Sequence, residues 1–485
     1  MLVFSALVGI DAAAASPPPI SYSSGLSQVF GVATFNKSTN TIAFLGAQPD
    51  LPRCAAAALN HTPRVWSFTF YDAHNASSPL ASGCFGVLEP RWSPAPAPSS
   101  TTGRVAWPCR TDDDCSLNGQ CLLPSGACAC RRAWEGPTCA TLRLVPGPRG
   151  AGFQPVDGGA PTSTWGGSVV PCAGGFCMIA SEIAGHCGIA AWSQNSRVVV
   201  ARAAAPGGAY ERVAELWPVF SHEPVLAVAP TGEVVVYYTA SKPPRPAACA
   251  CVNGSTTPGA CRAAATARGR RLNKDPSWMS WAASAEGPFT PGVQLWPDYV
   301  GADTNFAPLI LGNGSLLGMW RKWGGGHGGS RVFLATAQDW RNVSGYVQHK
   351  QELFPDLGAA GTEDMMLYAD KQGFFHAVFH HMYGVNTETA WWLLAAGGHA
   401  FSRDGVAWTY TGVAWGNSTA QGYDARFADG SSYHYTRLER PFVVLGSDGD
   451  PAYLVNAAQY GSSQSATAAN GGDAAYTLIQ PVAAE

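Results

Sequence analysis

Side chains that can exchange protons or bind polar groups stand just before apolar runs at several places in this 485-residue chain. A carboxyl group at such a position can donate or accept a proton in general acid–base chemistry. An arginine there can clamp a hydroxyl or carboxylate group. For any single residue, a hydrogen bond that caps a strand or joins neighbouring elements is an equally good interpretation. The residues concerned are His222, Glu223, Asp303, Asn305, Glu363, Asp364, Glu439 and Arg440.

These residues open copies of one pattern, in which an apolar run, a glycine turn and a second β-rich run follow one another. The five copies begin at Thr164, His222, Asn305, Glu363 and Glu439. A second pattern lies between them, in which an alanine and a polar residue precede a turn that ends on an aromatic residue. Two hairpins in every ~55–80 residues make a four-stranded blade, and five such units make a propeller. We therefore predict an all-β fold with a five-bladed β-propeller at 150–480; a β-sandwich with irregular strands is the alternative.

The repeated blade, together with the turn Ser402-Arg403-Asp404-Gly405-x-x-Trp408, resembles the five-bladed propellers of glycoside hydrolase family 43 and its relatives. The resemblance covers residues 150–480. It implies that the first strand of each blade lines a central funnel and that the polar residues leading those strands form a sugar site. In inverting members of the family, one carboxylate activates water and another protonates the leaving oxygen, and the two stand well apart.

Carried over residue by residue, the resemblance implies that Glu363 is the general acid and that Asp303 tunes it. Because side chains alternate along a strand, we expect Asp364 to point away from the funnel. The family's catalytic Asp of the first blade has no counterpart in Thr164-Trp165-Gly166-Gly167, and Trp165 could instead serve as a platform for a sugar ring. The candidate substrate-binding residues are Trp165, His222, Glu223, Asn305, His376 and Arg440.

Three histidines follow the fourth copy as His376-x3-His380-His381. At strand spacing, His376 and His380 share a face. We expect a stacked, hydrogen-bonded pair there, and a divalent ion at the propeller axis is the alternative. We expect no metal and no cofactor.

Six closely spaced cysteines form a second region, with the spacing Cys109-x5-Cys115-x5-Cys121-x6-Cys128-x-Cys130-x8-Cys139. A segment of about 30 residues cannot fold on apolar burial alone and needs such cross-links. Six cysteines allow 15 pairings in principle. With Gly136, the end of the segment resembles EGF-like domains, which implies the disulfides Cys109–Cys121, Cys115–Cys128 and Cys130–Cys139. Paired C-x2-C knuckles, which zinc sites usually show, are missing.

The remaining cysteines suggest further disulfides. The most economical assignment in a small β module at 20–90 is Cys54–Cys84. A Pro/Ser/Thr linker at 91–106 joins this module to the EGF-like domain at 107–140. An insertion at 242–275 interrupts the second blade. The pairing of the last six cysteines stays open: Cys172, Cys177, Cys187, Cys249, Cys251 and Cys261.

Several features favour a secreted protein. Residues 1–16 resemble a signal peptide, because a short apolar stretch leads into small residues. Even cysteine numbers and sequons are typical of an oxidising compartment. The seven Asn-x-Ser/Thr sequons begin at Asn36, Asn60, Asn75, Asn253, Asn313, Asn342 and Asn417.

The composition excludes several classes of protein. Charged residues make up 13% of the chain and the net charge is −3, so no basic footprint for nucleic acid exists. No apolar run approaches the ~18 residues that a membrane span needs. We therefore expect a secreted carbohydrate-active protein that hydrolyses glycosidic bonds at the propeller funnel and whose partner is a carbohydrate or an extracellular glycoprotein. The alternative is a non-catalytic adhesion protein that binds glycans or proteins.

Overall fold

The computed structural model describes residues 109–157, 160–245, 251, 275–297, 305–323, 330–355, 362–381, 397–416, 423–460 and 474–483, and before them only the strands of one sheet. Several predictions lie outside the described residues. They concern the signal peptide, the Cys54–Cys84 disulfide, Asp303, Cys249, Cys261 and the sequons at Asn36, Asn60, Asn75, Asn253 and Asn417.

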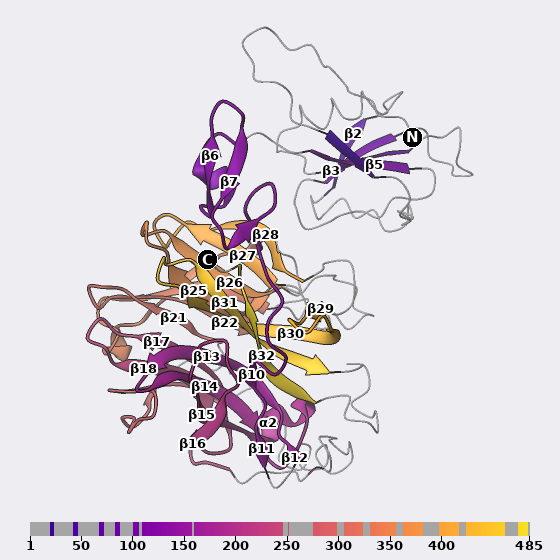
Figure 1. Ribbon diagram of the computed structural model, residues 1–485. Coiled ribbons are helices and arrows are strands. Elements are labelled where there is room, and N and C mark those ends of the chain that lie inside the picture. Colours follow the sequence, from indigo (N-terminus) through magenta and orange to yellow (C-terminus); the bar gives the residue numbers. More distant parts are fainter. Residues whose placement is uncertain are drawn as a thin grey trace. The chain divides into compact units, whose positions relative to one another are not determined.

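The chain forms two compact units, of which the first comprises residues 1–130 and 136–139 and the second 131–135 and 140–485. The first unit contains an antiparallel five-stranded sheet with the order β1-β5-β3-β4-β2 (Figure 1). Its strands are β1 (Ile20–Ser23), β2 (Ile42–Gly46), β3 (Ser67–Tyr71), β4 (Gly83–Val87) and β5 (Ser100–Val105).

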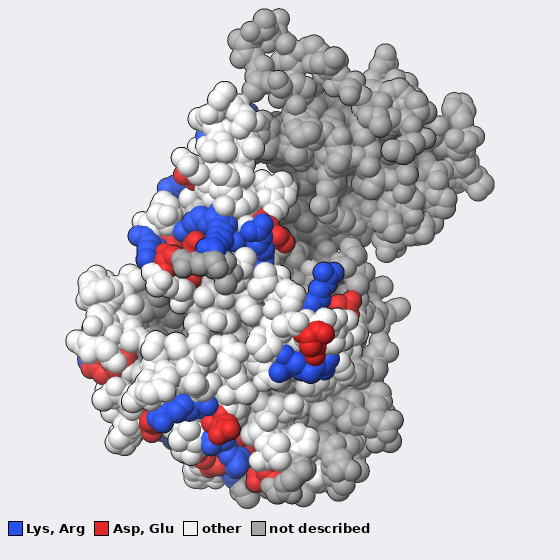
Figure 2. Space-filling model, in the orientation of Figure 1, with Lys and Arg blue, Asp and Glu red and all other residues white. Residues whose placement is uncertain are grey.

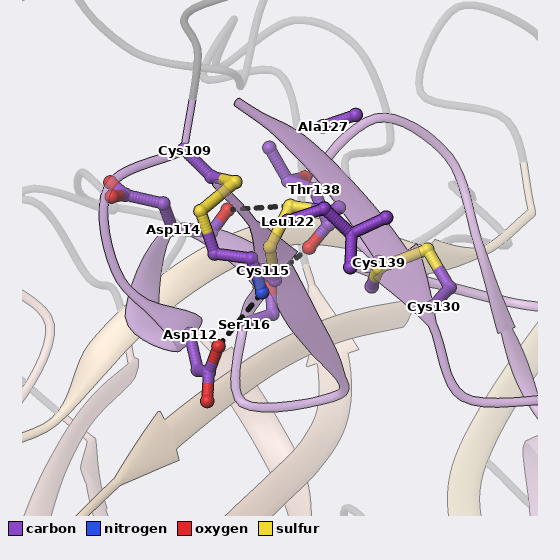
Figure 3. Close-up of a disulfide and its surroundings, with 12 residues drawn as sticks. Cys109, Asp112, Asp114, Cys115, Ser116, Leu122, Ala127, Cys130, Thr138 and Cys139 are labelled. Carbon is purple, nitrogen blue, oxygen red and sulfur yellow. Dashed lines mark hydrogen bonds between the residues drawn. A yellow bond between two sulfur atoms is a disulfide. The ribbon is translucent and has the colours of Figure 1, made fainter. Parts of the chain in front are cut away.

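The same unit contains a short segment that disulfides hold together. It consists of the 3-10 helix η3 (Asp112–Cys115) and the hairpin β6 (Gly119–Leu122) and β7 (Ala127–Cys130). Its disulfides join Cys109 to Cys121, Cys115 to Cys128 and Cys130 to Cys139, the same three pairs that the resemblance implies (Figure 3). Cys115 and Cys139 are fully buried. Cross-links therefore do here what an apolar core does in a larger domain.

The second unit consists mainly of five antiparallel sheets, four of them four-stranded. Blade 1 consists of β13 (Thr164–Cys172), β14 (Gly175–Ile183), β15 (Ser196–Ala203) and β16 (Glu211–Trp217). Blade 2 consists of β17 (Ser221–Val228), β18 (Val234–Ala240), β19 (Ser277–Ala282) and β20 (Val293–Gln294). Blade 3 consists of β21 (Ala307–Ile310), β22 (Leu316–Trp323), β23 (Ser330–Ala337) and β24 (Val347–Glu352). Blade 4 consists of β25 (Thr362–Ala369), β26 (Phe375–His381), β27 (Gly397–Ser402) and β28 (Thr409–Trp415).

Blade 5 draws strands from both ends of the unit. It contains β29 (Tyr423–Arg426), β30 (Ser432–Leu445), β31 (Pro451–Tyr460) and β32 (Ala475–Pro481), and β10 (Gly152–Phe153) pairs with β32. The first strands of the blades contact one another in the order β13, β17, β21, β25, β30 and back to β13. The ring is therefore closed, and the predicted all-β fold with a five-bladed propeller is confirmed.

Aromatic and aliphatic side chains fill the spaces between blades. Between blades 2 and 3, Tyr237, Phe306, Trp320 and Trp340 are all buried. Two disulfides strengthen blade 1 and its surroundings, Cys172–Cys177 and Cys187–Cys251. The second disulfide ties the insertion between β18 and β19 to residues that follow β14.

The turn that supported the resemblance lies between β27 and β28. Asp404 Oδ1 accepts hydrogen bonds from the backbone N–H groups of Val406 and Ala407, both at 2.8 Å, and from the Ser402 hydroxyl at 3.0 Å. We expect Asp404→Ala to lower the free energy of unfolding by about 1–2 kcal/mol, because the turn loses its acceptor. Asp404→Asn keeps an acceptor oxygen and should lose less than half as much. Urea denaturation of both variants checks this; equal losses would contradict it.

Candidate functional site at the propeller axis

One residue at the same place in each blade adopts a left-handed backbone conformation. These residues are Gly166, Glu223, Asn305, Asp364 and Arg440, with φ of 71, 55, 41, 55 and 48°. In four blades the pairing with the second strand also shifts register there, as in a β-bulge. Such a conformation costs a non-glycine residue about 1–3 kcal/mol and is concentrated at ligand and active sites. The five positions therefore mark one site, where the first strands of the blades meet.

Four of these side chains form a closed ring of contacts. Asn305 Nδ2 donates to Glu223 Oε2 at 2.7 Å and to Asp364 Oδ1 at 3.1 Å. Arg440 Nη1 donates to Asp364 Oδ1 at 2.8 Å and lies 2.9 Å from Glu223 Oε1. One cation and one amide thus bridge two carboxylates that come from different blades. We call these four residues the axial ring.

Gly166 completes the set from blade 1, and its missing side chain makes room for Arg440. A Cβ atom at position 166 would lie 2.9 Å from Arg440 Cβ and 3.1 Å from Nε. A side chain with a carboxylate would therefore collide with the arginine that pairs with both carboxylates of the axial ring. This contact explains why position 166, in the stretch where the resemblance led us to look for an Asp, is a glycine.

Two further carboxylates lie beside the axial ring. Glu363 forms an ion pair with Arg321, and its Oε1 is 3.2 Å from His380 Nδ1. Glu439 accepts two hydrogen bonds from Arg437, at 2.6 and 2.8 Å.

With Glu223 and Asp364 there are four carboxylates here, and three arginines and His380 face them. The charges of this network therefore balance when His380 is protonated. Arg437 also lies over the Trp165 ring, 4.7 Å from its centroid.

Burial and charge change the protonation of two members of the network. Burial raises the pKa of Asp364 to about 6, although Arg440 opposes the shift. Burial lowers the pKa of His380, but Glu439, Glu363 and Asp364 outweigh it and raise the value to about 9. Near neutral pH, His380 is therefore a cation, and the axial ring contains a carboxyl group that gains a proton easily.

His222 supports the ring from blade 2. Its Nδ1 lies 2.6 Å from Ser196 Oγ, and its ring stacks on Trp192 with 4.9 Å between centroids. Nε2 is 3.7 Å from Glu223 Oε1. A hydroxyl and an indole thus fix the imidazole beside the carboxylate, and aromatic surface from Trp192 lies near the axial ring.

Ligand atoms of Glu363, Asp364, His380 and Glu439 lie within 4.8 Å of one another, which is close enough for a metal ion. Glu and His side chains in this number would suit a divalent cation. The same carboxylates already pair with Arg321, Arg437 and Arg440. A metal ion would have to compete with these arginines, so the donor set fits an ion-pair network better than a metal centre.

In the fourth blade, the carboxylate at the propeller axis is Asp364 and not Glu363. The alternation argument placed Asp364 on the face away from the funnel, and this is wrong. The bulge at Glu363/Met366 and the left-handed Asp364 interrupt the alternation, and Asp364 contacts residues of blades 3 and 5. Glu363, the predicted acid, lies next to the axial ring and is held by Arg321 and His380. In blade 3, Asn305 occupies the axial position.

The prediction that His376 pairs with His380 is also wrong. His376 Nδ1 lies 3.1 Å from His399 Nε2, and the two rings stack. Its Nε2 is 3.3 Å from Asp370 Oδ2. Four residues along a strand span about 13 Å, so the two histidines of β26 find different partners. Burial lowers the pKa of His376, which is expected of a histidine in a packed interior.

Two arginines of the site, Arg321 and Arg437, were not predicted from the sequence. Arg321 and Arg437 stand inside strands, and no local pattern shows which carboxylate they meet. Arg440 was found, as was Glu223, and both directly precede a proline. A residue before proline ordinarily adopts an extended conformation, so the proline alone does not predict the left-handed conformation of these two residues.

No protein-family model and no curated protein matches the chain. Similar solved structures include an exo-β-1,3-galactanase from Clostridium thermocellum, with 12% identity, a TM-score of 0.41 and 68% of this chain covered. This chain covers 62% of that galactanase, less than two thirds of its length. An α-L-arabinofuranosidase from Lactobacillus brevis has 11% identity and a TM-score of 0.42, with 66% of this chain and 90% of that chain covered. A thermostable family-43 glycoside hydrolase has 12% identity and a TM-score of 0.40, with 67% of this chain and 91% of that chain covered.

Proposed function

We propose that the protein is a secreted carbohydrate-binding protein and that the axial ring with its neighbours contacts the sugar. The observation that carries this proposal is the ring itself, in which four residues from four blades hold polar groups in fixed positions. A cavity of about 20 Å³ beside Asn305, Asp364 and Arg440 has room for water only. A sugar would therefore contact the partly exposed carboxylates, Glu223 and Glu363, whose side chains are 11% and 14% exposed.

Binding without hydrolysis fits the geometry better than inverting catalysis. Asp364 Oδ1 and Glu223 Oε2 share the same Asn305 amide, so these oxygens lie within about 6 Å of one another. Inverting enzymes need about 6.5–9.5 Å between carboxyl groups to accommodate the attacking water. Arg440 also stands between these two carboxylates. A base that activates water needs a lone pair that is not held in this way.

A retaining glycoside hydrolase is the second candidate. Burial brings the pKa of Asp364 to about 6, a value that suits a general acid near neutral pH. The separation of the two carboxylates is compatible with the about 5–5.5 Å of retaining enzymes. In that case Glu223 would be the nucleophile, and Asp364 would pass its proton to the leaving oxygen through a water molecule in the small cavity beside it.

The proposal of secretion draws on the cross-links and sequons. Disulfides persist in oxidising compartments, and five of them link cysteines among the described residues. Asn313 and Asn342 are exposed, as glycosylation sites must be. We further propose that the segment from Cys109 to Cys139 is an EGF-like domain. Within the described residues, no helix has the length and apolar character to span a membrane.

A glycan array and a panel of chromogenic arabinosides and xylosides test the proposal. We expect the protein to bind at least one glycan without turnover, and Glu223→Gln to weaken that binding about ten-fold, because a charged acceptor for a sugar hydroxyl is lost. Glu211→Gln, an exposed glutamate of β16, is the matched control and should bind normally. Turnover by the parent that Asp364→Asn abolishes would establish the hydrolase instead. If the protein shows no binding and no turnover, both candidates are refuted.

A further inference from the structure

A cavity of about 360 Å³ lies in the second unit and shares no lining residue with the axial ring. Blade 5 supplies four tyrosines, and Tyr435 and Tyr460 are paired across β30 and β31. Ligand pockets begin at about 300 Å³ and are lined mostly by apolar and aromatic groups. Packed interiors leave few voids larger than water, so a space of this size is larger than an ordinary packing gap. Its aromatic walls are Tyr210, Phe427, Tyr433, Tyr435, Tyr460 and Tyr476.

The tyrosine rings of the cavity differ in exposure, and Tyr433 is the most exposed of them. Tyr460 and Tyr476 stack with 5.1 Å between centroids and 12° between planes. Tyr433 meets Tyr460 edge-on at 87°, and Tyr433 is 37% exposed. Tyr435 and Tyr476 are buried, and their hydroxyls lie 2.6 Å apart. A ligand that enters beside Tyr433 and Tyr460 would therefore meet ring faces first and phenolic hydroxyls deeper inside.

The walls present no uncompensated charge to a ligand. Burial raises the pKa of Tyr435 to about 12 and that of Tyr460 and Tyr476 further, so the phenols stay neutral at physiological pH. Arg149 is the charged lining residue, and it pairs with Asp429 at 3.1 Å while its guanidinium lies over Phe427. On the described part of the face that Figure 2 shows, small groups of opposite charge stand in a mostly uncharged surface.

We propose that this tyrosine cavity is a second binding site, independent of the axial ring, and that it takes a neutral sugar residue of a glycan. A sugar ring has apolar C–H faces and a rim of hydroxyls. Tyrosine matches both, because it combines an apolar ring with one polar group. A small anion would find its one candidate cation already paired. An ammonium ligand would have ring faces but no carboxylate from the lining residues.

The test uses Tyr433, because this side chain is exposed and substitutions of exposed residues usually change stability little. The strand offers a matched control in His434, which is exposed, adjacent in sequence and directed to the other face. The intact protein is screened on an array of neutral and uronic acid-containing oligosaccharides. Affinities for the best neutral hits are then measured by calorimetry for Tyr433→Ala, Tyr433→Phe and His434→Ala.

We expect Tyr433→Ala to weaken binding of a neutral oligosaccharide about ten-fold, because a stacking ring is lost. Tyr433→Phe and His434→Ala should stay within about three-fold of the parent. Glu223→Gln should leave this binding unchanged, which separates the cavity from the axial site. Two probes of other classes, p-nitrophenol and tetramethylammonium chloride, are titrated in parallel. Absence of any neutral glycan hit, hits that ignore Tyr433→Ala, or saturation by either probe without competition from sugar would overturn the proposal.

Discussion

Replacing Arg440 with methionine is expected to lower the free energy of unfolding by about 3–5 kcal/mol. Arg440 is 7% exposed and is the cation that Glu223 and Asp364 share at the axis. Its loss leaves two nearly buried carboxylates without the cation that they share, although the Asn305 amide still bridges them. Breaking a buried pair by removing one partner is costly because the remaining charge stays desolvated. Urea denaturation at pH 7.5 measures the loss.

The pH dependence and a control separate this explanation from lost packing. The pKa of Asp364 is about 6 even with Arg440 opposing the rise, so without the arginine this carboxyl group takes up a proton above pH 6. The deficit of Arg440→Met should therefore shrink as the pH falls from 7.5 through 6. Asp364→Asn in the same background should recover part of the stability, because it removes one of the two charges. Arg143→Met disrupts an exposed pair with Glu135 and should change stability by less than about 0.5 kcal/mol. A deficit that is independent of pH would mean that Arg440 acts only by filling space.

The fold could be predicted because its signals are local and repeated. In the sequence, each blade begins with an apolar run, a glycine turn and a second apolar run. In the structure, these two runs form the paired inner strands of the blade, for example β17 and β18. Repetition gave the number of blades. The pairing of β10 with β32 was not predicted, although it depends on Gly152, where a Cβ atom would lie 1.9 Å from the Thr477 carbonyl oxygen. The disulfides Cys109–Cys121, Cys115–Cys128 and Cys130–Cys139 came from a family resemblance, since spacing alone leaves 15 pairings open.

The site could be predicted only in part, because its geometry depends on contacts between blades. The search for polar residues ahead of apolar runs found Glu223, Asn305 and Arg440, which all occupy axial positions. It favoured Glu363 over Asp364 because a strand without a bulge alternates its side chains, and the bulge is not visible in the sequence of blade 4. Gly166 gave no signal of its own. Its role follows from Arg440, which lies 274 positions away in sequence and comes within contact distance only in the closed ring.

Stability is expected to fall as the pH rises from 6.5 to 9, and His380 is expected to cause most of that fall. Its pKa is about 9 in the folded protein, against about 6.5 in an unfolded chain. Below pH 6.5 the histidine is protonated in both states, so its attraction to Glu363 and Glu439 contributes in full. Between the two pKa values only the folded state holds the proton, and stability decreases with each step in pH. Over the whole window the difference amounts to about 3 kcal/mol.

Substitution of His380 isolates this contribution from other titrations. Burial lowers the pKa values of His376 and His399, so these residues are neutral in the folded protein throughout the window and cannot produce the same fall. His380→Gln keeps a hydrogen-bond donor for Glu363 but cannot be charged, so its stability should be nearly flat from pH 7 to 9. Urea midpoints at four pH values for both proteins give the two profiles. Parallel profiles would show that His380 is neutral at pH 7, and the four carboxylates would then face only three arginines.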